Sequence, residues 1–134
     1  MISASAKSIA IGDLQFRIVK VVFDKTAMGF VPSNMGEDQQ VLYVELQMLS
    51  GLKETFKNLQ MRLTDGAGKR SKAIILISGS IIQMLSDVIW KGPSSEYRPG
   101  KESIVWAFVV SEYMDEFYLN FPTGQVIDLR PLIK

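Results

Sequence analysis

Hydrophobic residues recur at every second position along several short segments of this chain. The clearest segment runs from Leu42 to Met48 and alternates apolar residues with Tyr43, Glu45 and Gln47. Successive side chains of a β-strand point to opposite faces, so this spacing is typical of a strand with one buried face. The chain is therefore predicted to consist mainly of β-strands, and this strand to bury its Leu42 face.

Two other segments support the same prediction. Residues 9–23 alternate around a bend at Gly12-Asp13, and their apolar second half suits a strand that is covered on both faces, twists or bulges. Residues 59–64 alternate before Asp65-Gly66-Ala67-Gly68, a strong turn signal. We expect a β-hairpin at this turn, with its second strand running toward Ile77.

The C-terminal part of the chain adds further strands. Residues 103–111 are apolar on both faces, which predicts a central strand that is covered on each side. Residues 117–121 and 126–129 flank the turn Pro122-Thr123-Gly124 and predict the last strands of the chain.

One segment breaks the two-residue period. Between residues 80 and 90 the apolar side chains fall at helical spacing, and they are Ile81, Met84, Leu85, Val88 and Ile89. Ser80 and Gln83 fit a capping box, and Lys91-Gly92-Pro93 supplies a stop. We therefore expect one short helix near residues 80–90, inserted between the sheets with its apolar stripe buried.

Six to eight strands separated by turns imply two antiparallel sheets packed face to face, or a barrel. The unequal loop lengths favour a Greek-key sandwich, so the expected fold class is all-β. No linker or internal repeat divides the 134 residues. We expect a flexible N-terminal segment at residues 1–8 and a single domain at residues 9–134, large enough to bury a core without metal ions or disulfides.

The composition excludes several classes of function. The chain contains no cysteine and no histidine, which removes thiolate nucleophiles, the usual zinc sites and the residue best suited to proton transfer near neutral pH. We therefore expect no catalytic residues, no cofactor and no enzymatic activity. Lysine and arginine number 15 against 14 acidic residues, so attraction of nucleic acid by net charge is not expected.

One local basic cluster stands out, formed by Lys69, Arg70 and Lys72. Beside a predicted turn, such a cluster is typical of a solvated hairpin end. The alternative is that these side chains contact a phosphate group or an acidic partner.

The sequence also bears on localisation. Residues 1–7 lack the apolar core of a signal peptide. The longest apolar stretch, residues 73–85, is interrupted by serine, glycine and glutamine and falls short of the ~20 residues of a transmembrane helix. We therefore expect no transmembrane segment. If a signal peptide precedes this sequence, we expect export to the periplasm, the cell surface or the medium; otherwise we expect a cytoplasmic location.

Three pieces of the chain carry a family resemblance: residues 40–46, residues 59–68 and residues 98–110. On these pieces the chain resembles domain-of-unknown-function family 4352, whose members are immunoglobulin-like sandwiches, mostly in bacterial exported proteins and lipoproteins. The family combines a long strand, an Asp-x-x-Gly hairpin and a Pro-Gly turn before a strand with phenylalanine. In this chain those places are held by Asp65, Gly68, Pro99, Gly100 and Phe108.

The resemblance spans residues 9–129 and departs from the family at Ser50-Gly51, where asparagine is usual, and in the apolar stretch 74–89. It implies an immunoglobulin-like antiparallel β-sandwich of about seven strands, and it brings no known catalytic residues. It also implies export, surface attachment or ligand contact. We therefore expect a non-enzymatic, exported or surface-associated binding or structural module, whose partner is a protein or another component of the cell envelope.

Acidic loop residues form one candidate metal site. In a sandwich whose first strands run alternately up and down, the loop 24–39 and the turn 65–68 lie at the same end. Calcium binds several carboxylate oxygens at once, and this end offers Asp24, Glu37, Asp38 and Asp65. No EF-hand spacing is present, so the alternative is that these residues keep the loops soluble.

The same loop is more apolar than a solvated connection usually is. Its candidates for partner contact are Met28, Phe30, Val31 and Met35. The alternative is that the loop folds back and caps the open end of the sandwich.

Three further functions are open alternatives. Paired carboxylates about 5–10 Å apart can hydrolyse glycosides, and the densest acidic group is Glu112, Asp115 and Glu116. An exposed edge strand can join subunits into an oligomer. The aromatic residues that can stack on sugars are Trp90, Tyr97 and Trp106, the last of which falls on a predicted core face.

Overall fold

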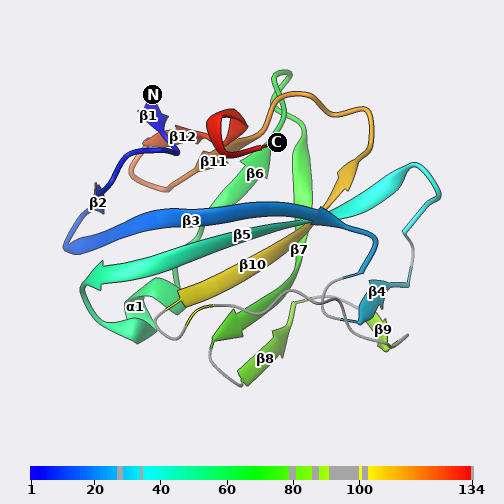
Figure 1. The fold of residues 1–134 in the computed structure, drawn as a ribbon, viewed down its shortest axis with the longest axis horizontal. Helices are drawn as coiled ribbons and strands as arrows, with labels where there is room; N and C mark the ends of the chain where they lie inside the picture. Colours follow the sequence, from blue (N-terminus) through cyan, green and yellow to red (C-terminus); the bar gives the residue numbers. More distant parts are fainter. Residues whose placement is uncertain are drawn as a thin grey trace.

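The computed structural model describes residues 1–26, 29–33, 35–78, 81–85, 88–90, 100 and 103–133. These residues form a ten-stranded sheet, a two-stranded ribbon, one short α-helix and one 3-10 turn (Figure 1). The elements are β1 (Ile2–Ser3), β2 (Ile9–Ile11), β3 (Leu14–Asp24), β4 (Phe30–Pro32), β5 (Gln39–Ser50), α1 (Lys53–Lys57), β6 (Arg62–Thr64), β7 (Arg70–Ser78), β8 (Ile81–Met84), β9 (Val88–Trp90), β10 (Ser103–Ser111), β11 (Tyr118–Asn120), β12 (Val126–Asp128) and η1 (Arg130–Leu132).

The large sheet curls into two layers that share β7. Its order is β1-β12-β11-β6-β7-β10-β5-β3-β2, with β8 paired to β7 beside this path. The first residues of β7 pair with β6, where Ser71 lies opposite Leu63. The rest of β7 pairs with β10, and this ladder ends where Ser78 lies opposite Ile104. Strand β7 therefore leaves the layer of β6, β11 and β12 and enters the layer of β10, β5 and β3.

The N-terminal segment closes the other side of the sandwich. Strand β1 pairs in parallel with β12, whereas β2, a few residues later, pairs with β3 in the opposite layer. The side chain of Gln125 donates a hydrogen bond of 3.1 Å to the backbone oxygen of Ala10, which ties the β11–β12 turn to β2. The sheet is thereby nearly closed around its core.

Aromatic side chains fill the space between the layers. Phe16 of β3 lies 6.1 Å from Phe121, measured between ring centroids, and Phe23 lies 5.5 Å from Phe117. Phe56 of α1 meets Phe16 edge to face at 6.0 Å. The short helix between β5 and β6 therefore covers one end of the core with a fully buried ring.

A second apolar cluster lies on the outer face of the central strands. It comprises Val41, Tyr43, Ile74, Ile75, Ile77, Val105 and Ala107, and Phe30 and Met35 pack against it. Strand β4, which contains Phe30, pairs with β9 in the two-stranded ribbon. Strand β5 buries its Leu42 face as predicted, but Tyr43 and Glu45 on the opposite face are also buried.

The expected helix near residues 80–90 is wrong. Ile81–Met84 and Val88–Trp90 are strands, and the helix of the described chain lies at Lys53–Lys57. Strand β8 forms an antiparallel ladder with β7, with Ile82 opposite Ile77, and β-branched residues favour that state. Ile82, Met84 and Leu85 are about two-fifths exposed rather than buried in a stripe. Ser80 and residues 91–93 lie outside the described residues.

The expected count of about seven strands is too low. Residues 9–23 were expected to form one strand, but the turn at Gly12-Asp13 divides them into β2 and β3. The short strands β4, β8 and β9 lie in segments that were expected to be a loop and a helix. The expected flexible segment of residues 1–8 contains β1, and Ala4 is fully buried.

Other predictions agree with the structure. The all-β class is confirmed, with a hairpin between β6 and β7 at Asp65–Gly68 and a central β10 that is buried on nearly every residue. The apolar half of the first long strand contains a register shift between Ile18 and Lys20, which is a bulge. Within the described ranges, no helix combines the length and the apolar character needed to cross a membrane.

Candidate functional site

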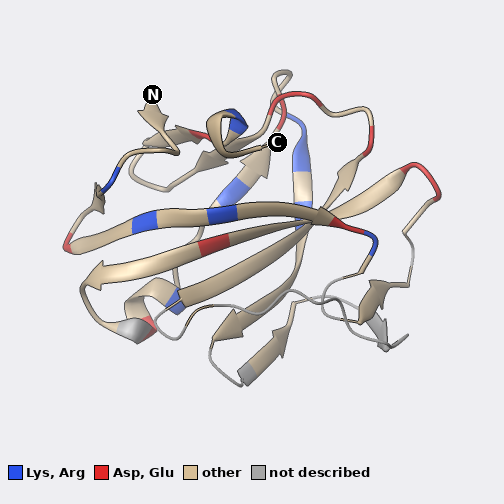
Figure 2. Ribbon diagram, in the orientation of Figure 1, with Lys and Arg blue, Asp and Glu red and all other residues tan. Residues whose placement is uncertain are grey.

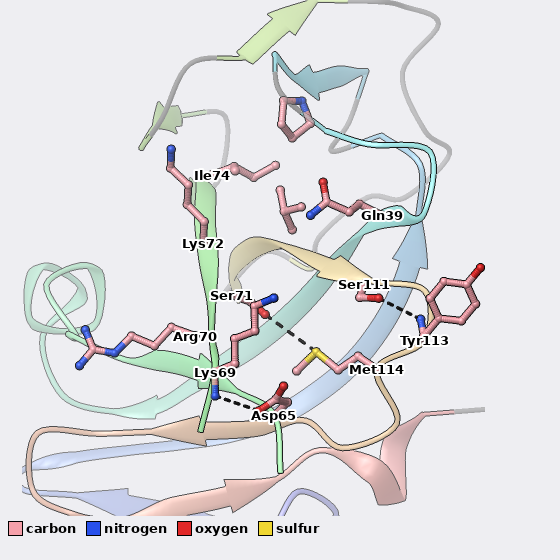
Figure 3. A pocket seen from close by; sticks show the side chains of 12 residues that line it. Gln39, Asp65, Lys69, Arg70, Ser71, Lys72, Ile74, Ser111, Tyr113 and Met114 are labelled. Atoms are coloured by element: carbon pink, nitrogen blue, oxygen red, sulfur yellow. Dashed lines mark hydrogen bonds between the residues drawn. The ribbon is translucent and has the colours of Figure 1, made fainter. Parts of the chain in front are cut away.

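A groove of about 520 Å³ lies where β7 and β10 meet the start of β5 (Figure 3). One side is formed by β7 and the turn before it, and the facing side by the chain that follows β10. Cavities of about 300–1,000 Å³ are typical of small-molecule sites. The groove therefore has the volume of a binding site for a small molecule or a short segment of a partner.

The β7 side of the groove is basic. Lys69, Arg70 and Lys72 all line it, and Figure 2 shows basic segments at the start of β7. In Figure 3 the side chains of Arg70 and Lys72 leave β7 on the side opposite Met114 and Tyr113, whereas Lys69 extends along the groove. None of the ion pairs found among the described residues includes these three cations.

The preceding turn fixes this basic side. The carboxylate of Asp65 accepts hydrogen bonds from the backbone N–H groups of Ala67, at 2.9 Å, and Lys69, at 2.8 Å. Gly68 has a φ of +84°, a conformation that a side chain would strain. Asp65, the acidic residue in the lining, thus has an oxygen occupied by the backbone of its own turn.

The facing side and the floor have different chemistry. The facing side carries the hydroxyls of Ser111 and Tyr113, and the Ser111 Oγ accepts a hydrogen bond of 3.2 Å from the Tyr113 backbone. The floor includes Pro32, Ile74 and Val109, all apolar. A bound molecule would thus meet cations on one side, hydroxyls on the other and hydrocarbon beneath.

A second cavity, of about 380 Å³, lies at the end of the sandwich where β3 ends and β5 begins. Its lining includes Phe23 and Phe117, which also form part of the core contact between the layers, together with Glu112, Asp115 and Arg130. This cavity gathers two of the three carboxylates that were candidates for hydrolysis.

Cations already contact two of those three carboxylates. Glu112 forms an ion pair with Lys25, and Glu116 lies 3.6 Å from the guanidinium of Arg130. Asp115 lines the second cavity. The acidic group therefore does not present a pair of free carboxylates facing each other.

Arg130 also organises the C-terminal segment. Its Nε and Nη2 atoms donate hydrogen bonds of 2.7–3.1 Å to the carboxylate of Asp128, and its guanidinium lies 5.6 Å from the ring centre of Tyr118. The side-chain hydrogen bonds from Arg130 are the main reason that the pKa of Asp128 is lowered below its usual value.

Two of the four candidate calcium ligands, Asp24 and Asp65, accept hydrogen bonds from nearby backbone N–H groups. Asp24 accepts a hydrogen bond of 3.2 Å from the backbone of Thr26, and Asp65 binds its own turn. Glu37 and Asp38 are exposed, and the amine of Lys25 donates to the backbone oxygen of Glu37 at 3.3 Å. In the part of the chain that the structure describes, no three acidic groups gather where a metal ion would bind. Calcium binding thus stays a prediction.

The apolar loop candidates divide into two groups. Phe30 and Met35 pack against the outer apolar cluster, and Val31 pairs with Ile89 in the β4–β9 ribbon. Met28 lies outside the described residues. The loop therefore folds back onto the protein, as in the alternative interpretation. It covers the outer face of the central strands, whereas the alternative placed it over the open end of the sandwich. Trp106 is buried, as its predicted core position requires.

Sequence reasoning found one side of the groove and missed the other. The cluster of Lys69, Arg70 and Lys72 was visible as a run of charge, but nothing local marks Ser111, Tyr113 and Met114 as its neighbours. Their proximity follows from the pairing of β7 with β10.

The comparisons with known proteins bear on the fold. No family model matches the sequence, and no curated protein matches it. An uncharacterized β-sandwich protein from Clostridium difficile 630 has a similar structure, with a TM-score of 0.57 over 95% of this chain and 91% of that chain. The two sequences are 8% identical. The likeness therefore shows that this chain has a β-sandwich fold and shows nothing beyond the fold.

Proposed function

We propose that this chain is a non-enzymatic, exported or surface-associated binding module, and that the groove between β7 and the segment after β10 is its binding surface. The observation that carries the proposal is the groove itself, a concave site of about 520 Å³ that combines an apolar floor with polar walls. Such a combination is typical of ligand sites. The expected partner is a protein or another component of the cell envelope.

The chemistry of the lining favours binding over catalysis. Nucleophilic catalysis needs a nucleophile beside a base that is itself oriented by a third group. The chain has no histidine or cysteine, and the carboxylate of Asp65 in the groove accepts two backbone hydrogen bonds. The hydroxyl of Ser111 accepts a hydrogen bond of 3.2 Å from the Tyr113 backbone.

The strand order supports the finer proposal of an immunoglobulin-like fold. In constant-type immunoglobulin domains one sheet has the order A-B-E-D and the other C-F-G. Here the order β3-β5-β10-β7 in the sheet corresponds to A-B-E-D, and the order β6-β11-β12 corresponds to C-F-G. The proposed membership of domain-of-unknown-function family 4352, which rests on the sequence resemblance, carries the export part of the proposal.

A groove-filling variant tests the proposed surface. We would screen a general fragment library by ligand-detected NMR against the wild type, against Ser111→Trp, and against Gln15→Trp, a matched control at an exposed position of β3 outside the groove. We expect that most of the fragments that bind the wild type will not bind Ser111→Trp but will still bind Gln15→Trp. Unchanged circular dichroism and melting temperature would show that both variants fold.

Two results would overturn this proposal. The first is a folded Ser111→Trp variant that binds the same fragments as the wild type, which would place the binding surface elsewhere. The second is turnover of a glycoside or ester by the wild type that Glu112→Gln or Asp115→Asn abolishes, which would favour the hydrolase alternative.

One observation favours a second candidate, a self-associating subunit. Among the described residues β8 pairs with β7 alone, and Ile82, Met84 and Leu85 are about two-fifths exposed on or beside β8. An apolar edge strand is a ready surface for pairing with another copy. Light scattering after size-exclusion chromatography tests self-association. A wild-type oligomer that Ile82→Lys dissociates, and that Gln60→Lys at an exposed control position preserves, would support a self-associating subunit. A monomeric wild-type protein would contradict it.

A further inference from the structure

The charge of the groove is local rather than global. The whole chain carries a formal net charge of +1, yet three of the groove-lining residues are basic and one is a carboxylate, although the Arg70 side chain points to the far side of β7. That carboxylate, Asp65, already accepts two backbone hydrogen bonds, whereas the cations take part in none of the ion pairs of the described chain. A concave surface with an excess of positive charge concentrates anionic ligands.

The apolar part of the groove lies directly beside these cations. Lys72 stands opposite Val109 in the ladder between β7 and β10, and directly opposed side chains lie on the same face of a sheet. Val109 is partly exposed, as is Pro32, which also lines the groove, whereas Ile74 beneath them is almost fully buried. A ligand that reaches the Lys72 amine therefore has hydrocarbon within reach of the rest of its structure.

These two features select one class of ligand. An inorganic anion would use the cations and leave the floor in contact with water. A neutral apolar compound would use the floor and leave the cations without partners. An organic anion uses both, and charge-assisted hydrogen bonds are the stronger kind. The hydroxyl of Ser111 on the facing side can donate a further hydrogen bond to a ligand.

We infer that the groove binds a small organic anion, with its carboxylate or phosphate group held on the basic β7 side by Lys72 and its apolar body on the partly exposed Val109 and Pro32. This inference rests on the proposed function, because it assigns a ligand class to the same groove. A volume of about 520 Å³ accommodates a bicyclic aromatic body together with its anionic group.

The experiment compares matched probes by NMR titration at low salt. Naphthylacetate is the anionic probe, naphthylacetamide its neutral counterpart, and acetate the anion without the apolar body; naphthyl phosphate replaces the carboxylate head. We expect naphthylacetate to bind about tenfold or more tightly than either the amide or acetate. Naphthyl phosphate binding more tightly than naphthylacetate would identify a phosphate head, and the reverse a carboxylate head.

Two charge-reversal variants complete the test. Lys72→Glu should weaken naphthylacetate binding by about tenfold or more and leave naphthylacetamide binding nearly unchanged. Lys7→Glu, which makes the same change of net charge at an exposed position away from the groove, should leave both affinities unchanged. Raising the salt concentration should weaken the anion and not the amide.

The inference would be overturned by equal binding of naphthylacetate and naphthylacetamide, by an unchanged affinity of Lys72→Glu, or by no binding of any anionic probe. Its failure is distinguishable from failure of the proposed function. If neutral fragments still bind the groove and Ser111→Trp removes them, the binding surface stands and only the ligand class is wrong.

Discussion

Lys72 of β7 lies directly opposite Val109 of β10. The two strands are separated in the sequence by β8 and β9, and their pairing places a cation beside an apolar side chain on the outer face of the sheet. Both residues line the groove. The mixed polar and apolar character of the proposed site therefore follows from the register of a single strand pair.

Removal of the Phe16 ring should strongly destabilise the sandwich. Phe16 is fully buried and contacts both Phe121 in the opposite layer and Phe56 of α1. Phe16→Ala should lower the free energy of unfolding by about 3–5 kcal/mol, measured by urea denaturation. Val19→Ala on the same strand is the control, since Val19 is 38% exposed, and should change stability by less than about 0.5 kcal/mol. A loss below about 1 kcal/mol in Phe16→Ala would contradict the packing described for the core.

Loss of the Tyr43 hydroxyl should loosen the loop after β3. The hydroxyl donates a hydrogen bond to the backbone oxygen of Thr26, just beyond Asp24. Tyr43→Phe should cost about 0.5–1.5 kcal/mol of stability and speed amide hydrogen exchange in the loop. Tyr113→Phe is a matched control at a position that is 78% exposed, and it should have no measurable effect on either quantity. Equal effects of the two variants would count against a structural role for the Tyr43 contact.

Two glycines should respond differently to alanine. Gly51 and Gly68 both have positive φ, at +119° and +84°. A Cβ atom at Gly51 would lie 2.5 Å from Leu14 Cδ2, whereas one at Gly68 would have no heavy atom within 4 Å. We expect Gly68→Ala to cost about 1–2 kcal/mol through backbone strain alone, and Gly51→Ala to cost clearly more, as measured by thermal and urea denaturation. A smaller loss in Gly51→Ala than in Gly68→Ala would show that the contact with Leu14 is not as close as described.

Stability should depend on the ionisation of Asp128 at acid pH. Hydrogen bonds from Arg130 lower the pKa of Asp128 in the folded state below its ordinary value of 3.8, so the folded state favours the ionised form. This contribution is present above pH 3.8 and is lost as the pH falls through the lowered pKa. Asp128→Asn should therefore be less stable than the wild type at neutral pH, and the difference should shrink in acid.

Urea denaturation across this pH range measures the effect, with Asp13→Asn as the control. Asp13 lies in the exposed turn between β2 and β3, and its replacement should leave the pH dependence as it is in the wild type. A difference between Asp128→Asn and the wild type that stays constant down to strongly acid pH would contradict a role for Asp128 ionisation.

Local patterns were sufficient where local chemistry decides the structure. The Asp65–Gly68 hairpin was predictable because the Asp65 carboxylate and the positive φ of Gly68 build the turn within a few residues. The buried Leu42 face of β5 was predictable because alternation over seven residues leaves one consistent face. The central place of β10 was visible because both of its faces are apolar.

Other features depend on contacts between distant parts of the chain. Tyr43 is buried because it belongs to a second cluster on the outer face of the sheet, against which Phe30 and Met35 pack, and the buried Glu45 on the same face accepts a hydrogen bond from the Gly100 backbone. The spacing of Ile81, Met84 and Leu85 fits a helix, but pairing with β7 makes the segment a strand. A short apolar run does not distinguish the two states by its period alone. For the same reason, the sequence predicted only the basic side of the groove. The second side lies next to the first because β7 pairs with β10.

We propose that this sandwich binds its ligand in the groove beside β7. Backbone amide shifts recorded by NMR during titration of the wild-type protein with naphthylacetate test it most directly. The largest shifts should fall on residues lining the groove, Lys72, Val109 and Ser111 among them, and these shifts should saturate together. Shifts that saturate at the second cavity near Phe117, or along β8, while those three amides stay unchanged would contradict it.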